Sequence, residues 1–274
     1  MYLLLAVFPG IAAVVSLCGL VANPTNVVNH IKEFSGILPP GSWDLFKSEL
    51  DELVKQGVGS LTFAAVFGML VAFWSARSAM AALMTATNIA YGEREKRALF
   101  QQVVLSLAFT VGTIGAFLIV VGFGVAIPRL LLMAGISEWV RWLAAPLRAG
   151  IIWAMGSLGF AIIYRYGPAR QLARWRWVTW GSSIAATLWL LASALFAFYV
   201  QKVGSYGKLY GALSSVIVLL VWFYLSSFLL VLGALVNAEM ERQTARDTTV
   251  GSEAPLGERG AYVADTIGET SEDA

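Results

Sequence analysis

Residues that build redox and metal sites are almost absent from this chain. Its 274 residues include one cysteine, Cys18, and one histidine, His30. A single cysteine cannot form an intrachain disulfide, and structural zinc sites need several Cys or His ligands. We therefore predict no metal and no cofactor. Cys18 lies inside an apolar run and is interpreted as a small packing residue.

Charged residues are also scarce. They make up 13% of the chain, whereas 58% of it is hydrophobic, and an average soluble domain carries about 25% charged residues. The 19 Lys and Arg residues exceed the 17 Asp and Glu residues by two, giving a formal net charge of +2. Nucleic-acid binding usually needs a stronger basic surplus. The composition therefore predicts a membrane protein and no nucleic-acid partner.

Long apolar runs account for this composition. A helix that crosses the hydrocarbon core needs about 20 mostly apolar residues. Six such segments are expected, with Pro128 closing the third and Pro146 interrupting the start of the fourth; they are residues 3–21, 59–90, 100–127, 149–164, 178–200 and 211–236. We predict an all-α, polytopic membrane domain of about six transmembrane helices over residues 1–242.

Two segments before the second apolar run are unusual. The run at 3–21 has neither the basic region nor the cleavage site of a signal peptide, so we expect a transmembrane helix whose preceding segment is missing from this chain. Residues 42–56 place apolar side chains on one helical face and charged ones on the other. This predicts an amphipathic extracytoplasmic helix at the interface or over the mouth of the bundle.

Basic residues between the apolar runs set the orientation. Cytoplasmic loops carry an excess of Lys and Arg, and two loops are rich in them: Arg94, Lys96 and Arg97, then Arg165, Arg170, Arg174 and Arg176. Both loops and both termini are therefore expected in the cytoplasm. From Asp247 onward seven acidic residues stand against one base, Arg259. Residues 243–274 are expected to form an acidic, disordered cytoplasmic tail.

Several segments match a known family. They are Phe8-Pro9-Gly10, Asn88 to Arg97, Arg165-Tyr-Gly-Pro168, Ala186-Thr-Leu-Trp189, Gly204-Ser-Tyr206, Tyr210-Gly-Ala-Leu213 and Gly233-Ala-Leu-Val-Asn-Ala-Glu239. Together they resemble the YihY/BrkB family over nearly the whole chain except the acidic tail. The resemblance implies a bacterial inner-membrane protein with six spans and cytoplasmic termini. Some members carry the label ribonuclease BN, others virulence factor, and a transport or lipid-handling role has been suggested.

The ribonuclease label has little chemistry to support it. A metal-dependent nuclease needs several converging His, Asp or Glu residues. His30 lies in the stretch between the first two apolar runs. The carboxylates lie in loops and in the tail, with Glu239 at a helix end. We find no nucleophile elbow and no phosphate-binding glycine loop. No catalytic residue is predicted, and the chain is not expected to be an enzyme.

Polar residues inside the apolar runs are more informative. A charge at the centre of the bilayer costs at least about 2.5 to 3.5 kcal/mol, so Arg77, deep inside the second run, needs an explanation. It either snorkels to an interface or lines a cavity. The same helical face carries Trp74, Thr85 and Asn88.

These residues define a candidate substrate path. Its members are polar or aromatic residues of the spans and their ends: Arg77, Asn88, Trp189, Tyr206, Tyr210, Trp222, Tyr224, Asn237 and Glu239. The leading hypothesis is a transporter or flippase-like permease for a polar or amphipathic small molecule or lipid. Alternatives are a membrane scaffold that recruits cytoplasmic partners or anionic lipids and an intramembrane enzyme. Membrane lipids are the expected partners, and the sequence predicts no oligomeric state.

Overall fold

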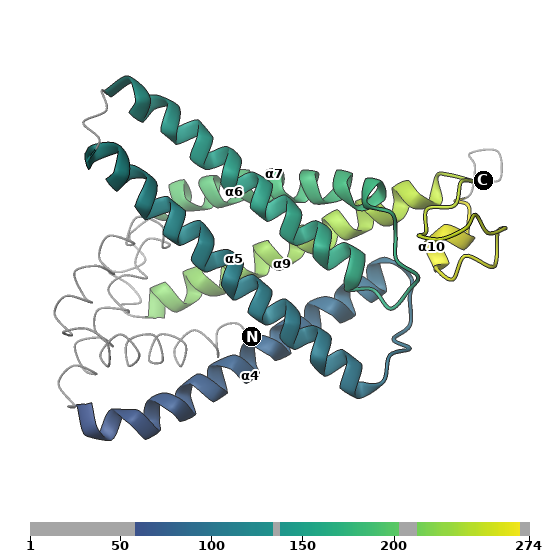
Figure 1. Cartoon of the computed structure of the whole chain (residues 1–274), viewed down its shortest axis with the longest axis horizontal. Helices are drawn as coiled ribbons and strands as arrows, with labels where there is room; N and C mark the ends of the chain where they lie inside the picture. Colours follow the sequence, from purple (N-terminus) through teal and green to yellow (C-terminus); the bar gives the residue numbers. More distant parts are fainter. Residues whose placement is uncertain (1–57, 134–137, 203–212, 269–274) are drawn as a thin grey trace. The chain divides into compact units, whose positions relative to one another are not determined.

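Long helices make up most of the protein in the computed structural model (Figure 1), which describes residues 58–133, 138–202 and 213–268. The long helices are α4 (Val58–Ala90), α5 (Leu99–Met133), α6 (Glu138–Tyr166), α7 (Trp175–Lys202) and α9 (Leu213–Arg242). A short helix, α10 (Tyr262–Asp265), follows near the C-terminus. Within the described ranges the only β pairing is an isolated bridge between Ala173 and Thr249. The prediction of an all-α fold is confirmed.

Four of the helices are long and apolar enough to cross a membrane. The qualifying stretches are Leu99–Ala116 of α5, Ala149–Tyr166 of α6, Trp175–Lys202 of α7 and Val216–Arg242 of α9. Over the described residues α4 does not meet this criterion. The chain is thus a polytopic membrane protein, as predicted. The expected first span at 3–21, the amphipathic segment at 42–56, Tyr206 and Tyr210 lie outside the described residues.

Two prolines lie inside helices that they were predicted to interrupt. α5 continues past Pro128 to Met133, and α6 begins at Glu138, before Pro146. Both expectations were wrong. A proline removes one N–H donor but does not always end a helix. Membrane proteins tolerate proline inside long helices where neighbouring groups satisfy the freed backbone atoms.

The chain divides into two units. The described part of the first unit comprises residues 58–79, 121–133, 192–202 and 213–225. The second comprises residues 80–120, 138–191 and 226–268. Its buried apolar core includes Tyr91, Tyr164, Val178, Leu230 and Val263.

Small residues bring α7 and α9 together in the second unit. A Cβ added to Gly181 would collide with the carbonyl of Gly233 and the side chain of Asn237. A Cβ added to Gly233 would lie 2.6 Å from the Cβ of Ala185. Close helix contacts of this kind are typical of membrane proteins, where packing replaces the hydrophobic effect between helices. The contact places the ends of both helices next to the site described below.

Candidate functional site

The loop after α6 and the segment after α9 are joined by backbone hydrogen bonds. Arg174 N donates to Thr248 O at 2.9 Å, Val250 N donates to Leu172 O at 2.8 Å, and Gln171 N donates to Gly260 O at 3.0 Å. In Figure 1 the C-terminal segment, in yellow, lies beside this loop. The segment was expected to be disordered from Asp247. In the structure residues 247–268 are instead folded, because the loop supplies hydrogen-bond partners that composition does not reveal.

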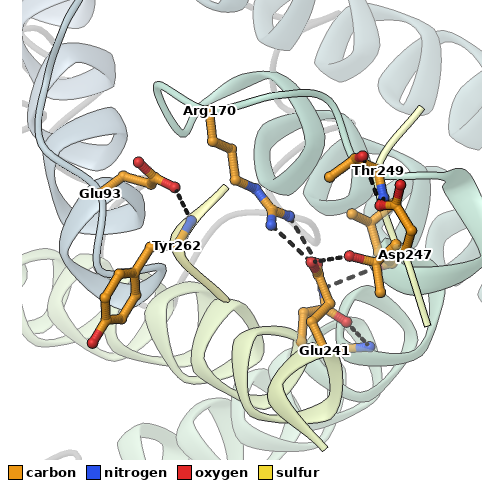
Figure 2. A network of polar contacts seen from close by, with 10 residues as sticks. Glu93, Arg170, Glu241, Asp247, Thr249 and Tyr262 are labelled. Carbon is orange, nitrogen blue, oxygen red and sulfur yellow. Dashed lines mark hydrogen bonds and ion pairs between the residues drawn. The ribbon is translucent and has the colours of Figure 1, made fainter. Parts of the chain in front are cut away.

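A buried ion pair lies under this junction (Figure 2). Nη1 and Nη2 of Arg170 donate to the two carboxylate oxygens of Glu241, both at 2.8 Å, and neither side chain is exposed. Thr248 Oγ1 donates a third hydrogen bond to Glu241 at 3.1 Å. The ring of Tyr91 lies 4.2 Å from the Arg170 guanidinium carbon. Bidentate, charge-assisted bonds of this geometry are among the stronger polar contacts in proteins.

Burial and charge act on the two groups of this cluster that lie outside the spans. Burial by itself would lower the pKa of Arg170, but the hydrogen bonds and charge of Glu241 outweigh it, and the pKa of Arg170 is raised. Burial also raises the pKa of the Tyr91 hydroxyl, and the nearby Arg170 cation opposes only part of that effect. Arg170 is therefore permanently charged and Tyr91 permanently neutral at physiological pH.

Hydrogen bonds of Asp247 and Arg259 hold the C-terminal segment, residues 247–268, in its fold. Asp247 accepts hydrogen bonds from Thr249 N at 2.9 Å, Thr249 Oγ1 at 2.8 Å and Ala254 N at 3.1 Å. Burial opposes ionisation of Asp247, but these bonds and the Arg259 charge outweigh it and lower its pKa. Arg259 itself donates to the carbonyls of Ala245, Ala254 and Ala264. The segment thus has a fixed fold of its own.

The loop between α4 and α5 joins the same assembly. Tyr262 N donates to Glu93 Oε1 at 2.6 Å, as Figure 2 shows. Arg97 donates to the carbonyls of Tyr166, the last residue of α6, and of Gly167 and Pro168, which follow it. Both basic loops identified in the sequence and the acidic segment therefore form one folded cap on the second unit. We call it the polar cap, comprising residues 91–98, 165–174 and 241–268.

Three predicted path residues have structural partners in the second unit. Asn88 accepts from Ala169 N at 2.7 Å and donates to Glu95 at 2.9 Å. Asn237 is fully buried, accepts from Gly181 N at 2.8 Å and donates to Val178 O at 3.2 Å. Trp189 donates to Ser226 Oγ at 2.9 Å. Each of these three side chains holds two chain segments together.

The other described candidates are more exposed. Glu239 is exposed and pairs with Arg242 at 3.4 Å. In the first unit, Arg77 is half-buried with its guanidinium carbon 5.1 Å from the Trp74 ring. Trp222 packs on Phe223, and the side chain of Tyr224 is 74% exposed. Whether any of these residues touches a substrate stays a prediction.

Sequence reasoning missed Glu241, although a signal for it was present. It selected Glu239, which lies two residues earlier and therefore about 200° away around the helix. Ala234, Asn237, Ala238 and Glu241 recur at the spacing of one buried helical face. An ionisable residue on such a face needs a partner, and the arginines of the preceding loop were the available cations.

The site offers no obvious metal-dependent chemistry. In the described ranges no three His, Cys, Asp or Glu side chains are placed to hold a metal ion. The buried acids of the polar cap, Glu93, Glu241 and Asp247, bind arginine, hydroxyl or backbone N–H groups. The arrangement therefore supports a structural role for these carboxylates.

Comparison with known proteins agrees with this architecture. The chain is 29% identical over 247 residues to the "Putative ribonuclease-like protein YfkH" of Bacillus subtilis, covering 88% of this chain and 87% of that protein. It is 26% identical over 217 residues to the "UPF0761 membrane protein IL2447" of Idiomarina loihiensis, covering 76% and 70%. A third relative, the "UPF0761 membrane protein VV0203" of Vibrio vulnificus, is 27% identical over 260 residues, covering 89% and 77%.

No solved structure matches the chain. The family model described as "Virulence factor BrkB" matches residues 2–256, which include every described helix except α10. The segments that suggested the resemblance fall inside this match. From its sequence and its helical membrane fold, the chain is a member of the BrkB family.

Proposed function

We propose that the protein is a permease of the bacterial inner membrane for a polar or amphipathic molecule, with both termini in the cytoplasm. The observation that carries this proposal is the position of Arg77 in α4. It lies 13 residues before the C-terminal residue of α4, Ala90, which corresponds to about 20 Å along the helix. We infer that α4 is the second span predicted from the sequence, and an ionisable residue inside a span is a functional candidate by default.

Arg77 lies beside an aromatic ring of its own helix. Its side chain is half-buried, and Trp74, one turn earlier, is 63% exposed. A guanidinium near an aromatic face can bind an anion while the ring contacts an apolar part of the same molecule. This pairing suits an amphipathic substrate with a negative group.

The polar cap weakens the main argument for a recruiting scaffold. That alternative relied on the basic loop after α6 and on the acidic tail to recruit cytoplasmic partners or anionic lipids. Arg170 is buried in its pair with Glu241, and Arg174 Nε donates to Thr249 O at 2.8 Å. These two cations already have acceptors within the chain, so they contribute little to recruiting an acidic protein partner. The name of the Bacillus relative keeps an enzymatic role as a further alternative.

A two-stage experiment tests the permease proposal. Purified protein is first heated with a panel of anionic metabolites and lipids, because a ligand that prefers the folded state raises its stability. Compounds that stabilise it are then tested for uptake into proteoliposomes. We expect Arg77→Leu to insert normally but to lose transport, and Arg77→Lys to retain part of it because the charge remains.

Arg94→Gln is the matched control, since Arg94 is an exposed arginine in the loop after the same helix. It is expected to transport at the wild-type rate. Equal rates for wild type and Arg77→Leu would remove Arg77 from the path. Stabilisation without any uptake by the wild-type protein would favour a binding scaffold instead.

A further inference from the structure

Arg165, near the C-terminus of α6, has an unsatisfied guanidinium. Its residue surface is 9% exposed, and its Nε and Nη1 atoms are buried with no hydrogen-bond partner among the described residues. The nearby Arg170 also has an unpartnered Nε, but its other two nitrogens are bound to Glu241. A buried cation without a counter-charge is costly, so Arg165 requires a different explanation from Arg170.

Two aromatic rings fix the Arg165 side chain. Its guanidinium carbon lies 5.5 Å from the centre of the Tyr166 ring and 4.5 Å from that of Trp175. The two rings meet edge to face, with centres 6.4 Å apart. Cation–π contacts orient a guanidinium but leave its N–H donors unused. The side chain is therefore held in one orientation beside Trp175, and none of the described acids forms an ion pair with it.

The N-terminus of a long helix lies beside this cation. Trp175 is the first residue of α7, a helix of 28 residues. The N–H groups of a first turn have no intrahelical acceptor and carry the positive end of the helix dipole. Trp177 N donates back to Arg174 O at 3.0 Å, and Arg176 is exposed beside Trp175. Helix start and arginines together form a site of positive potential suited to an anion.

The location of this site identifies the kind of anion. The apolar stretch of α6 ends at Tyr166, and that of α7 begins at Trp175. Trp175 and Trp180 are 44% and 62% exposed, as expected for tryptophans at the level of the lipid headgroups. An anion at this depth is the phosphate of a phospholipid.

We propose that Arg165, Arg176 and the N-terminus of α7 form a binding site for the phosphate group of an anionic phospholipid. The flanking indole of Trp175 packs on the glycerol and upper acyl region of the same lipid. This site is separate from the Arg77 path and does not depend on the permease proposal. It also gives Arg165 the counter-charge that the described protein residues do not supply.

Lipid binding to the full chain, purified in a neutral detergent, tests this site. The probes are short-chain phosphatidylglycerol, phosphatidylcholine of the same chain length, and glycerol 3-phosphate. Titration is followed by thermal stability and by native mass spectrometry. We expect phosphatidylglycerol to bind, and Arg165→Gln to weaken that binding at least about tenfold, the loss expected for one charge-assisted contact. Arg94→Gln, in an exposed position of another loop, is expected to bind normally.

Each remaining outcome has a defined meaning. Equal phosphatidylglycerol affinity for wild type and Arg165→Gln would overturn the site, as would equal binding of phosphatidylcholine. Arg165-dependent binding of glycerol 3-phosphate as tight as that of phosphatidylglycerol would support the phosphate site but overturn its assignment to a lipid. If Arg165→Gln does not fold, Arg165→Lys and Arg176→Gln provide the same comparison, and wild-type affinity in both would overturn the proposal.

Discussion

The guanidinium of Arg170 and the carboxylate of Glu241 form a two-pronged ion pair across 71 residues of sequence, with both hydrogen bonds 2.8 Å long. The pair joins the loop after α6 to the last turn of α9, and Thr248 bonds the following segment to the same carboxylate. The polar cap is therefore built around a charge pair that water does not reach (Figure 2). The contribution of this ion pair to the free energy of unfolding can be measured directly.

Removing one member of the pair should destabilise the protein strongly. Glu241→Gln leaves the Arg170 cation buried without its counter-charge, and breaking such pairs costs about 3 to 5 kcal/mol. The measurement is the midpoint of unfolding in denaturant. Glu239→Gln is the control, since Glu239 is exposed, and it should change stability by less than about 0.5 kcal/mol. Similar losses in both variants would contradict the buried pair.

A double replacement separates the role of the charges from that of the shape. Arg170→Met with Glu241→Leu removes both charges and keeps apolar volume, so it should recover much of the stability lost in Glu241→Gln. Unfolding midpoints of wild type, Arg170→Met, Glu241→Leu and the double variant form the cycle. A double variant as unstable as the sum of the singles would show that the two side chains do not interact.

The helix positions followed from sequence more readily than the polar cap. The run predicted at 59–90 is a helix at 58–90, and that predicted at 178–200 extends over 175–202, because an apolar stretch of this length has few alternatives in a membrane. The folded state of the C-terminal segment could not be predicted in this way. Its partners, such as Leu172 O for Val250 N, lie 78 residues earlier in the chain.

The candidate site was only partly accessible to sequence reasoning. Asn88 and Asn237 were selected as candidate path residues, and that role stays a prediction. Most of their partners are backbone groups that any sequence carries, which is why the sequence did not reveal these contacts. Glu241 was missed because helix-end acids are usually exposed. The sequence also did not reveal that two guanidinium nitrogens of Arg165 have no hydrogen-bond partner among the described residues, since that depends on which segments fold against it.

The contact between α7 and α9 should tolerate no side chain at Gly181. Gly181→Ala places a methyl group against the Gly233 carbonyl and the Asn237 amide, and overpacking of this kind costs about 1 to 3 kcal/mol. The control is Gly159→Ala in α6, where nothing lies within 4 Å of the added Cβ. That change should be neutral or slightly stabilising, because alanine favours a helix. The measurement is the thermal unfolding midpoint of the two variants, and an equal midpoint for both would contradict the tight contact at Gly181.

The fold of the C-terminal segment should loosen in acid. Because the folded-state pKa of Asp247 is lowered, its stabilising contribution is complete above the unfolded value of about 3.9. It is lost as pH falls through the lower folded value. Limited proteolysis of the segment with an acid-tolerant protease measures this. Asp247→Asn should be cleaved faster already at neutral pH and lose this acid dependence, whereas the exposed Glu253→Gln should behave like wild type.

The orientation of the polar cap is open to chemical labelling. Its loops hold most of the arginines that predict a cytoplasmic position, and Gln171 lies among them with an exposed side chain. With Cys18→Ala as background, Gln171→Cys should not react with a membrane-impermeant maleimide in intact cells but should react once the cells are permeabilised. Ser48→Cys, in the segment predicted to be extracytoplasmic, should react in both conditions. Labelling of Gln171→Cys but not of Ser48→Cys in intact cells would reverse the orientation and place the Arg165 site in the outer leaflet.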